Sequence, residues 1–195
     1  YEHWRPKAGK QKEEQFSDRY AVITGGTQGL GEATARLFAE RGAAGLVICG
    51  RNTQNGERVT VELSALGCQT LFVQADLSRV EDCRAVTSAA DRAFGRVDIL
   101  VNAAGVTDRG GILDTTPEVF DHIFAVNVRA PFFLMQEAAK VMRREKIAGS
   151  IVNILSMAAL GGQAFIGAYS GSKGALATLT RNAAHSLLKD QIRVN

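Results

Sequence analysis

The sequence contains little cysteine or histidine, with three residues of each type among its 195 residues. The odd number of cysteines and their wide spacing exclude a disulfide framework, so reduced thiols in a cytoplasmic protein are expected. The histidines lie far apart and lack the spacing of metal ligands, so no metal site is expected. The residues concerned are Cys49, Cys68, Cys83, His3, His122 and His185. Cys49 sits in an apolar run and is interpreted as core filler rather than a nucleophile.

Long hydrophobic runs are also absent, and no stretch approaches the roughly 20 apolar residues that a membrane span needs. The net charge of +3 is small and dispersed, and no Lys/Arg stripe suggests nucleic-acid binding. Residues 1–19 are polar and mixed in charge, which is unlike a secretory signal, and they are predicted to form a polar extension. With 46% hydrophobic and 22% charged residues, the remaining 20–195 fit one globular domain.

Apolar runs alternate with helical patterns along this domain. Strands are predicted at 20–24, 46–49, 70–73, 97–101 and 150–155, and a sixth begins at 191–195. Helices are predicted at 32–41, 55–66, 78–94, 116–146 and 168–189, with Ser78 as a cap and a possible kink near Pro131. Because the strands are uniformly apolar, both faces of the sheet should be buried. The pattern predicts a single-domain α/β fold, a Rossmann-like doubly wound parallel sheet with helices on both faces.

Glycines are concentrated where the first strand meets the first helix, in Thr24-Gly25-Gly26-Thr27-Gln28-Gly29-Leu30-Gly31. Glycine permits a tight turn and close approach of a pyrophosphate to the backbone. The following helix directs its first N–H groups at such an anion. A plain turn between strand and helix is the simpler alternative, but its place in the first βαβ unit favours a dinucleotide site.

A serine, a tyrosine and a lysine form a second pattern: Ser156 ends a strand, and Tyr169 and Lys173 open a helix. Residues four apart lie on one helical face. A free tyrosine has a pKa of about 10, and a nearby ammonium favours its phenolate form. Tyr169 is therefore the predicted acid/base, and Ser156 a donor to the same substrate oxygen. Taken singly, Ser156 could satisfy a strand end, and Tyr169 and Lys173 could be an amphipathic pair.

Together these motifs resemble those of the short-chain dehydrogenase/reductase family over about 20–195. Two small departures are Asn102-Ala103-Ala104-Gly105 where Asn-Asn-Ala-Gly is frequent, and Leu155 where a second serine is frequent. The resemblance implies that Asn127 holds a water linked to Lys173, although a core hydrogen bond would also explain this residue. It implies cofactor contacts from Gly25, Thr27, Gln28, Gly29, Leu30, Gly31, Asp76, Leu77, Asn102, Ala103, Ala104, Gly105, Tyr169 and Lys173. Asp76 could instead, or also, cap a helix.

The end of the second strand bears on the choice of nicotinamide cofactor. An acid there would bind both ribose hydroxyls of NAD and repel a phosphate. This sequence has Gly50-Arg51-Asn52 instead, and the guanidinium of Arg51 could face a 2′-phosphate. NADP is therefore favoured and NAD remains possible, with Arg51 and Asn52 as further cofactor contacts. The simpler alternative is that Arg51 lies on the surface.

These observations predict an NAD(P)-dependent oxidoreductase that interconverts a small-molecule secondary alcohol and a carbonyl. Two alternatives are a non-catalytic nucleotide-binding regulator and a nicotinamide-dependent epimerase or dehydratase. The resemblance implies a homo-oligomer, a dimer or tetramer, through the helices at 116–146 and 168–189. Members of the family continue beyond a similar Arg-Val-Asn, so the C-terminal part is expected to be missing here. The resemblance leaves 3-oxoacyl thioesters, sugars or polyols, and simple secondary alcohols open as substrates.

Overall fold

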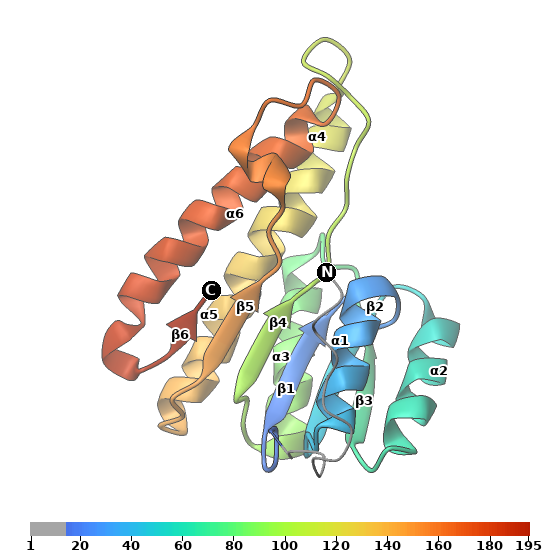
Figure 1. The fold of residues 1–195 in the computed structure, drawn as a ribbon, viewed down its shortest axis with the longest axis vertical. Helices are drawn as coiled ribbons and strands as arrows, with labels where there is room; N and C mark the ends of the chain where they lie inside the picture. The colour runs from blue at the N-terminus through green and yellow to red at the C-terminus, as the bar shows by residue number, and fades with distance from the viewer. Residues whose placement is uncertain (1–14) are drawn as a thin grey trace, which may run out of the picture.

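A computed structural model describes residues 15–195, and most of the predicted polar extension lies outside these described residues. Six strands form one sheet in the order β3-β2-β1-β4-β5-β6, and every neighbouring pair is parallel (Figure 1). The strands are β1 Tyr20–Thr24, β2 Gly45–Gly50, β3 Gln69–Gln74, β4 Ile99–Asn102, β5 Ser150–Asn153 and β6 Arg193–Val194. The predicted doubly wound parallel sheet is confirmed.

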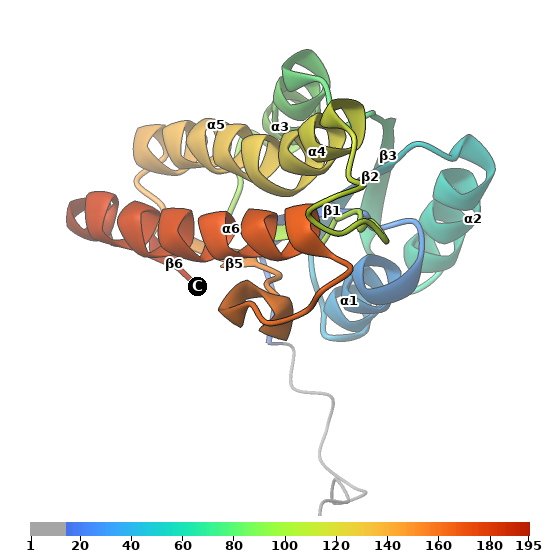
Figure 2. The same ribbon diagram turned by 90° about the horizontal axis from the view of Figure 1, so that it is seen from above.

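Helices cover both faces of the sheet (Figure 2). The α-helices are α1 Gly29–Glu40, α2 Thr53–Ser64, α3 Val80–Phe94, α4 Pro117–Phe124, α5 Ala130–Arg144 and α6 Gly167–Ser186. A π-helical segment spans Ala125–Arg129, and short 3₁₀ helices span Met157–Leu160 and Leu188–Asp190. Alternate strand residues enter two cores: Ala21 and Ile23 lie in the core beneath α1 and α2, whereas Val22 lies in the core with α3 and α5.

The structure bears on two sequence predictions about helices. The helical pattern predicted at 116–146, with a kink near Pro131, is formed by α4, the π-helical segment and α5 in unbroken succession. Pro131 has no N–H to donate to the carbonyl of Asn127 four residues earlier, and this missing hydrogen bond accounts for the wider turn. The prediction that Ser78 caps α3 was wrong: α3 begins at Val80, with Arg79 as its N-cap and no side-chain cap, and Ser78 lies in the preceding turn, where its N–H donates to Asp76 Oδ1 at 2.9 Å.

The strand order reverses its direction between β1 and β4, which pair with each other in the middle of the sheet. In an open parallel sheet, ligands bind outside the carboxyl ends of the strands at such a point. The residues that follow β1, β2, β3 and β4 therefore meet at one edge. This edge contains the predicted nucleotide-binding turn.

Candidate active site

Backbone sterics require glycine at the turn between β1 and α1. Gly25 and Gly29 have φ values of 66° and 55°, in the left-handed region that favours glycine. A Cβ at Gly31 would lie 2.2 Å from the carbonyl oxygen of Gly25. No side chain caps the N-terminus of α1, so its first N–H groups remain available for an anion. The turn has the shape of a phosphate cradle.

A cleft of about 670 Å³ extends from this turn along the carboxyl ends of β2, β3 and β4. Thirteen residues predicted as cofactor contacts line it: Gly25, Thr27, Gln28, Gly29, Leu30, Gly31, Arg51, Asn52, Asp76, Leu77, Ala103, Ala104 and Gly105. The other three do not line it: Asn102, Tyr169 and Lys173. The cleft thus fits a dinucleotide in both its glycine cradle and its length along the sheet edge.

Asp76 is held in place at the adenine end that the resemblance implies. Its Oδ1 accepts a hydrogen bond from Ser78 N, and its own N–H donates to Asp82 Oδ2 at 2.8 Å. Hydrogen bonds from Ser78, with smaller contributions from the positive charges of Arg51 and His122, lower the pKa of Asp76. The carboxylate is therefore an ionised acceptor, and it also organises the turn before α3.

Gly50 occupies the end of β2, where an acid would select NAD. A Cβ at Gly50 would lie 2.5 Å from Thr27 Oγ1, so the Thr27 side chain fills this space. Arg51 follows as an exposed residue, and its backbone carbonyl accepts a hydrogen bond from Gln74 Nε2 at 3.2 Å. The cleft therefore presents a hydroxyl and a guanidinium here, and no carboxylate at position 50.

Lys173 and Tyr169 lie one turn apart at the start of α6. The Lys173 Nζ donates to the backbone carbonyl of Ile154 at 2.7 Å and lies 5.8 Å from the centre of the Tyr169 ring. A Cβ at Gly105, a residue of the cleft wall, would lie 3.6 Å from Lys173 Nζ. Burial lowers the pKa of Lys173, which is 5% exposed. The amine is thus fixed between the Tyr169 ring and the cofactor cleft.

Ser156 lies beyond the end of β5 rather than within the strand. Its Oγ accepts a hydrogen bond from Ala158 N at 3.1 Å and caps the 3₁₀ helix Met157–Leu160. The local role considered from sequence is therefore present, and the hydroxyl can still donate its hydrogen to another acceptor. The 3₁₀ helix packs against α6, which brings the loop after Ser156 beside the helix that carries Tyr169.

Asn127 is fully buried in the π-helical segment, and its amide fixes the loop after β4. Asn127 Oδ1 accepts from Val106 N at 2.9 Å, and Nδ2 donates to Val106 O at 2.8 Å. The same Nδ2 donates to Ser172 Oγ at 3.0 Å, and Ser172 Oγ donates to the Tyr169 carbonyl at 2.7 Å. Ser172, which the sequence analysis did not single out, connects Asn127 to the helical turn that carries Tyr169.

Replacing Ser172 with Ala should loosen that turn without touching the cofactor cleft. We expect kcat to fall about tenfold, because a buried bond is lost that contributes about 1–3 kcal/mol. The cofactor dissociation constant should be unchanged. Ser186→Ala removes a similar bond, to Asn182 O at 2.8 Å on the exposed end of α6, and is the matched control. Equal losses in the two variants would contradict a positioning role for Ser172.

Comparisons with known proteins agree with this geometry. Residues 19–195 match the family model described as short chain dehydrogenase. The chain belongs to the short-chain dehydrogenase/reductase family. It is 33% identical over 181 residues to galactitol 2-dehydrogenase of Agrobacterium fabrum, covering 93% of this chain and 69% of the relative. It is 40% identical over 187 residues to sex determination protein tasselseed-2 of Zea mays, covering 93% of this chain and 54% of the relative.

Solved structures of short-chain dehydrogenases share the fold. A metagenomic short-chain oxidoreductase in complex with NADP has a TM-score of 0.87 and 35% identity, covering 92% of this chain and 81% of that one. An NAD⁺-bound xylitol dehydrogenase has a TM-score of 0.87 and 28% identity, covering 93% and 69%. The protein is thus an oxidoreductase of this family, acting on CH–OH groups with a nicotinamide cofactor.

Six residues of the short-chain dehydrogenase cleft were not predicted as cofactor contacts: Cys49, Gly50, Ala75, Val106, His122 and Val126. Cys49, Gly50 and Ala75 lie at strand ends within two residues of predicted contacts, so their position at the same sheet edge could have indicated them. His122 and Val126 come from α4 and the π-helical segment, and their approach depends on helix packing. The Cys49 side chain is buried as expected, and burial raises its pKa to about 12, so a thiolate nucleophile is disfavoured.

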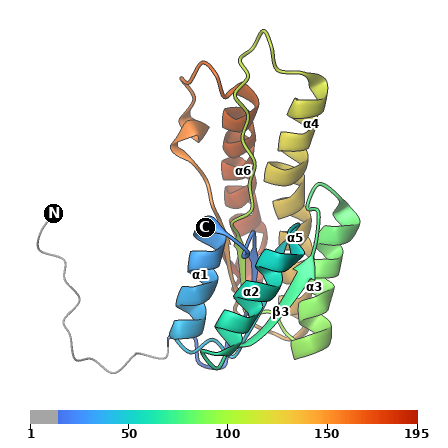
Figure 3. The same ribbon diagram turned by 90° about the vertical axis from the view of Figure 1, so that its right-hand side faces the viewer.

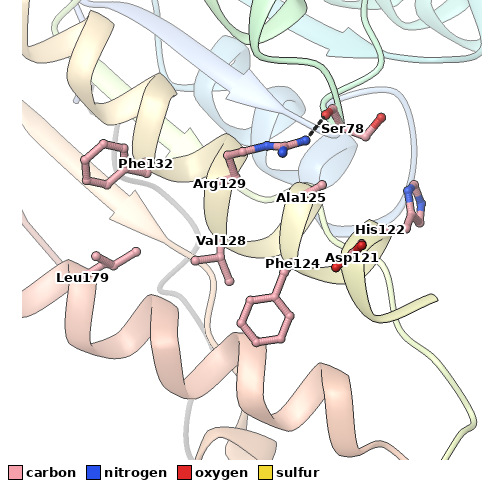
Figure 4. Close-up of a pocket in the computed structure, with 9 residues that line it drawn as sticks. All are labelled: Ser78, Asp121, His122, Phe124, Ala125, Val128, Arg129, Phe132 and Leu179. Carbon is pink, nitrogen blue, oxygen red and sulfur yellow. Dashed lines mark hydrogen bonds between the residues drawn. The ribbon is translucent and has the colours of Figure 1, made fainter. Parts of the chain in front are cut away.

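A second hollow, of about 740 Å³, lies along the outside of α4, the π-helical segment and α5 (Figure 4). Phe124, Val128 and Phe132 line it together with Leu179 of α6, and Arg129 donates from its rim to Ser78 O at 2.6 Å. Across residues 15–195, no group of three or more His, Cys, Asp or Glu side chains is placed to hold a metal ion. Within the same range, no helix has the length and apolar character needed to cross a membrane.

Proposed function

We propose that the protein interconverts a secondary alcohol and a carbonyl compound, with Tyr169 as acid/base and Ser156 and Lys173 as its partners. The observation that carries the proposal is the fixed position of Lys173. Its Nζ is held by Ile154 O at 2.7 Å, close to the Tyr169 ring and to Gly105 of the cofactor cleft. A lysine with only a solvating role would lie at the surface, whereas Lys173 is buried between these groups.

The proton chemistry follows from these residues. The nicotinamide, when bound, accepts or supplies the hydride. In reduction, the Tyr169 O–H donates its proton to the substrate oxygen, and in oxidation the Tyr169 oxygen accepts it. The Lys173 ammonium favours the phenolate, and the Ser156 O–H donates to the same substrate oxygen as its charge develops. Asn127 keeps the backbone around Val106 in place and is proposed to serve the proton path to Lys173.

Net turnover separates this function from its two alternatives. With free NADP and a panel of secondary alcohols, absorbance at the reduced-nicotinamide band should rise in proportion to the carbonyl product. A nucleotide-binding regulator would bind the cofactor without any absorbance change. An epimerase or dehydratase would convert substrate with no net reduction of free cofactor. Either of the last two results, obtained with protein that binds the cofactor, would contradict the proposal.

NADP is the proposed preferred cofactor, and NAD a possible one. Support comes from the glycine at position 50, the Thr27 side chain that fills the space of an acid, and the adjacent Arg51. Gln28, Asn52 and Leu77 are proposed as further contacts along the cleft, and Asn102 as support for its wall. The side chain of Asn102 donates to Asn153 Oδ1 at 2.8 Å, which ties β4 to β5.

Replacing Arg51 with Ala should raise the KM for NADP by about tenfold, because charge-assisted hydrogen bonds contribute about 1.5–3 kcal/mol and Arg51 is exposed. The KM for NAD should change little. Steady-state kinetics with both cofactors tests the prediction, and Arg92→Ala on α3 removes an exposed arginine away from the cleft as the control. A parent protein with strong NAD preference, or an equal loss for both cofactors, would contradict it.

We also propose a homo-oligomer, a dimer or tetramer, that associates through α4, α5 and α6. Support comes from the apolar hollow of Figure 4 and from exposed aromatic side chains nearby, Phe120 at 45% and Phe132 at 43%. A reducing, cytoplasmic environment is proposed from the three cysteines, which are all free and buried. The partners proposed are small-molecule alcohols and carbonyls, without nucleic acid or membrane. Residues 1–19 are proposed to be an extension outside the catalytic domain 20–195.

A further inference from the structure

Two loops border the catalytic groups at the carboxyl edge of the sheet. One links β4 to α4 through residues 103–116, and the other links β5 to α6 through residues 154–166 (Figure 3). They meet where Gly167 N donates to Gly110 O at 3.2 Å, and a Cβ at Gly111 would lie 3.0 Å from Ala164 O. Ser156 lies in the second loop and Tyr169 in the first turn of α6, which follows it, so the two loops border the groups at which the substrate is proposed to react.

The exposed side chains of these loops are predominantly apolar. Residues 157–168, between Ser156 and Tyr169, contain no charged residue and no histidine. Five large apolar side chains on the two loops are highly exposed: Ile112 at 96%, Leu113 at 97%, Met157 at 77%, Leu160 at 81% and Phe165 at 60%. We call these five residues the apolar rim. Large contiguous apolar surfaces are uncommon on proteins unless they bind something.

Some polar groups on the same loops are buried or already hydrogen-bonded within the protein. The Asp108 carboxylate is 7% exposed, and both of its oxygens are buried without a hydrogen-bond partner. Asp114 Oδ1 accepts from Gly111 N at 2.6 Å, and Thr115 Oγ1 donates to Gly111 O at 2.8 Å. Thr107, Arg109, Asp114, Thr116 and Gln163 are exposed, but of these only Gln163 lies in 157–168, the segment between Ser156 and Tyr169. Recognition of a polyol needs several placed donors and acceptors, and this segment offers one polar side chain.

We propose that the substrate of this enzyme carries an apolar ring or aliphatic body next to its reacting carbon, which the apolar rim covers. The inference rests on the proposed oxidoreductase function, since it places the carbonyl at Ser156 and Tyr169. It narrows the substrate class to apolar ketones and their secondary alcohols, rather than polyols and their keto sugars. The occupant of the apolar rim is thus a small molecule held beside the catalytic groups.

The test compares two neutral ketones of similar size, 1-decalone and the keto sugar fructose, on the full chain with NADPH. We expect kcat/KM for decalone to exceed that for fructose by about a hundredfold after the fructose value is referred to its open-chain keto form, since apolar burial accounts for about tenfold per one or two methylenes. Calorimetric binding of both compounds to the NADP-loaded protein is measured in parallel. Decalone bound without turnover would support the apolar site while contradicting the oxidoreductase mechanism. A preference for fructose, equal binding, or binding of neither would overturn the inference.

Variants of the rim make the test specific. Phe165→Ser and Leu160→Ser should each lower kcat/KM for decalone by about tenfold and leave the KM for NADPH unchanged. Val61→Ser, at a residue 70% exposed on α2, is the matched control and should have no effect. Sedimentation of each variant is compared with the parent. A change in oligomeric state with unchanged decalone kinetics would assign the rim to a subunit interface and overturn the proposal. If the protein instead reduces a keto acid in preference to decalone, and Arg109→Ala removes that preference, the proposal is also overturned.

Discussion

Replacing Tyr169 with Phe is expected to lower kcat by about 10²- to 10⁴-fold, the usual contribution of a general acid/base. The substitution removes one oxygen and keeps the ring that lies 5.8 Å from Lys173 Nζ. Tyr169 does not line the cleft of about 670 Å³, so the cofactor dissociation constant should stay within about threefold of the parent value. Single-turnover kinetics and fluorescence titration with NADPH measure the two quantities separately.

The control for this variant is Tyr20→Phe at the start of β1. The Tyr20 ring packs on Phe94 with a centroid distance of 4.8 Å, away from the carboxyl edge. The Tyr20→Phe substitution also removes one hydroxyl, and it should leave kcat unchanged. Activity retained in the Tyr169 variant, at more than about a tenth of the parent, would assign the proton to another group.

The protonation state of Lys173 should affect how the activity of the parent enzyme varies with pH. Burial lowers the pKa of this lysine, so its ammonium is lost at a lower pH than that of a surface lysine. Below this pKa the ammonium is present and can support Tyr169 in its proposed role, and above it that support disappears. The rate of oxidation should therefore decline on the alkaline side, at a lower pH than the loss of a proton from a surface lysine, and a pH series of kcat measures this decline.

Local sequence patterns predicted the elements that depend on local physics. Uniformly apolar runs such as that of β2 identify buried parallel strands, because both of their faces need apolar cover. The glycine turn was predictable because the left-handed φ values at Gly25 and Gly29 favour glycine, the residue type found there. The division of the helix at 116–146 was harder to locate, since the pattern indicates Pro131 and the wider turn precedes it at Ala125–Arg129.

The tertiary contacts of the site were less accessible from sequence. Ser172 is one residue before Lys173 and has no distinctive spacing, so its bond to Asn127 depends on how α6 packs against the π-helical segment. His122 enters the cleft for a similar reason, because α4 brings it near Asp76 after the chain has crossed the sheet edge. Spacing along one helix predicts neighbours on that helix, whereas neighbours on another helix require the fold.

Replacing Gly31 with Ala should abolish cofactor binding more completely than the loss of any single polar contact. A Cβ at this position would lie 2.2 Å from Gly25 O and 2.6 Å from Gly25 C, and neither backbone atom can move without opening the turn. Several N–H groups would then be misdirected, each contributing about 1.5–3 kcal/mol to a charged phosphate. We expect the dissociation constant for NADPH to rise at least about a hundredfold.

For the Gly31→Ala variant, the free energy of unfolding and the dissociation constant for NADPH are both measured, so that a loss of folding can be told apart from a loss of binding. The strain should also lower the free energy of unfolding by about 1–3 kcal/mol, as overpacking usually does. Gly174→Ala is the control, because a Cβ there meets Ala159 O at 3.6 Å in ordinary contact and α6 favours alanine. Unchanged NADPH affinity in a folded Gly31 variant would mean that the turn does not hold the pyrophosphate. Since the proposed chemistry at Tyr169 requires a nicotinamide beside Gly105, that result would also remove the basis for the mechanism.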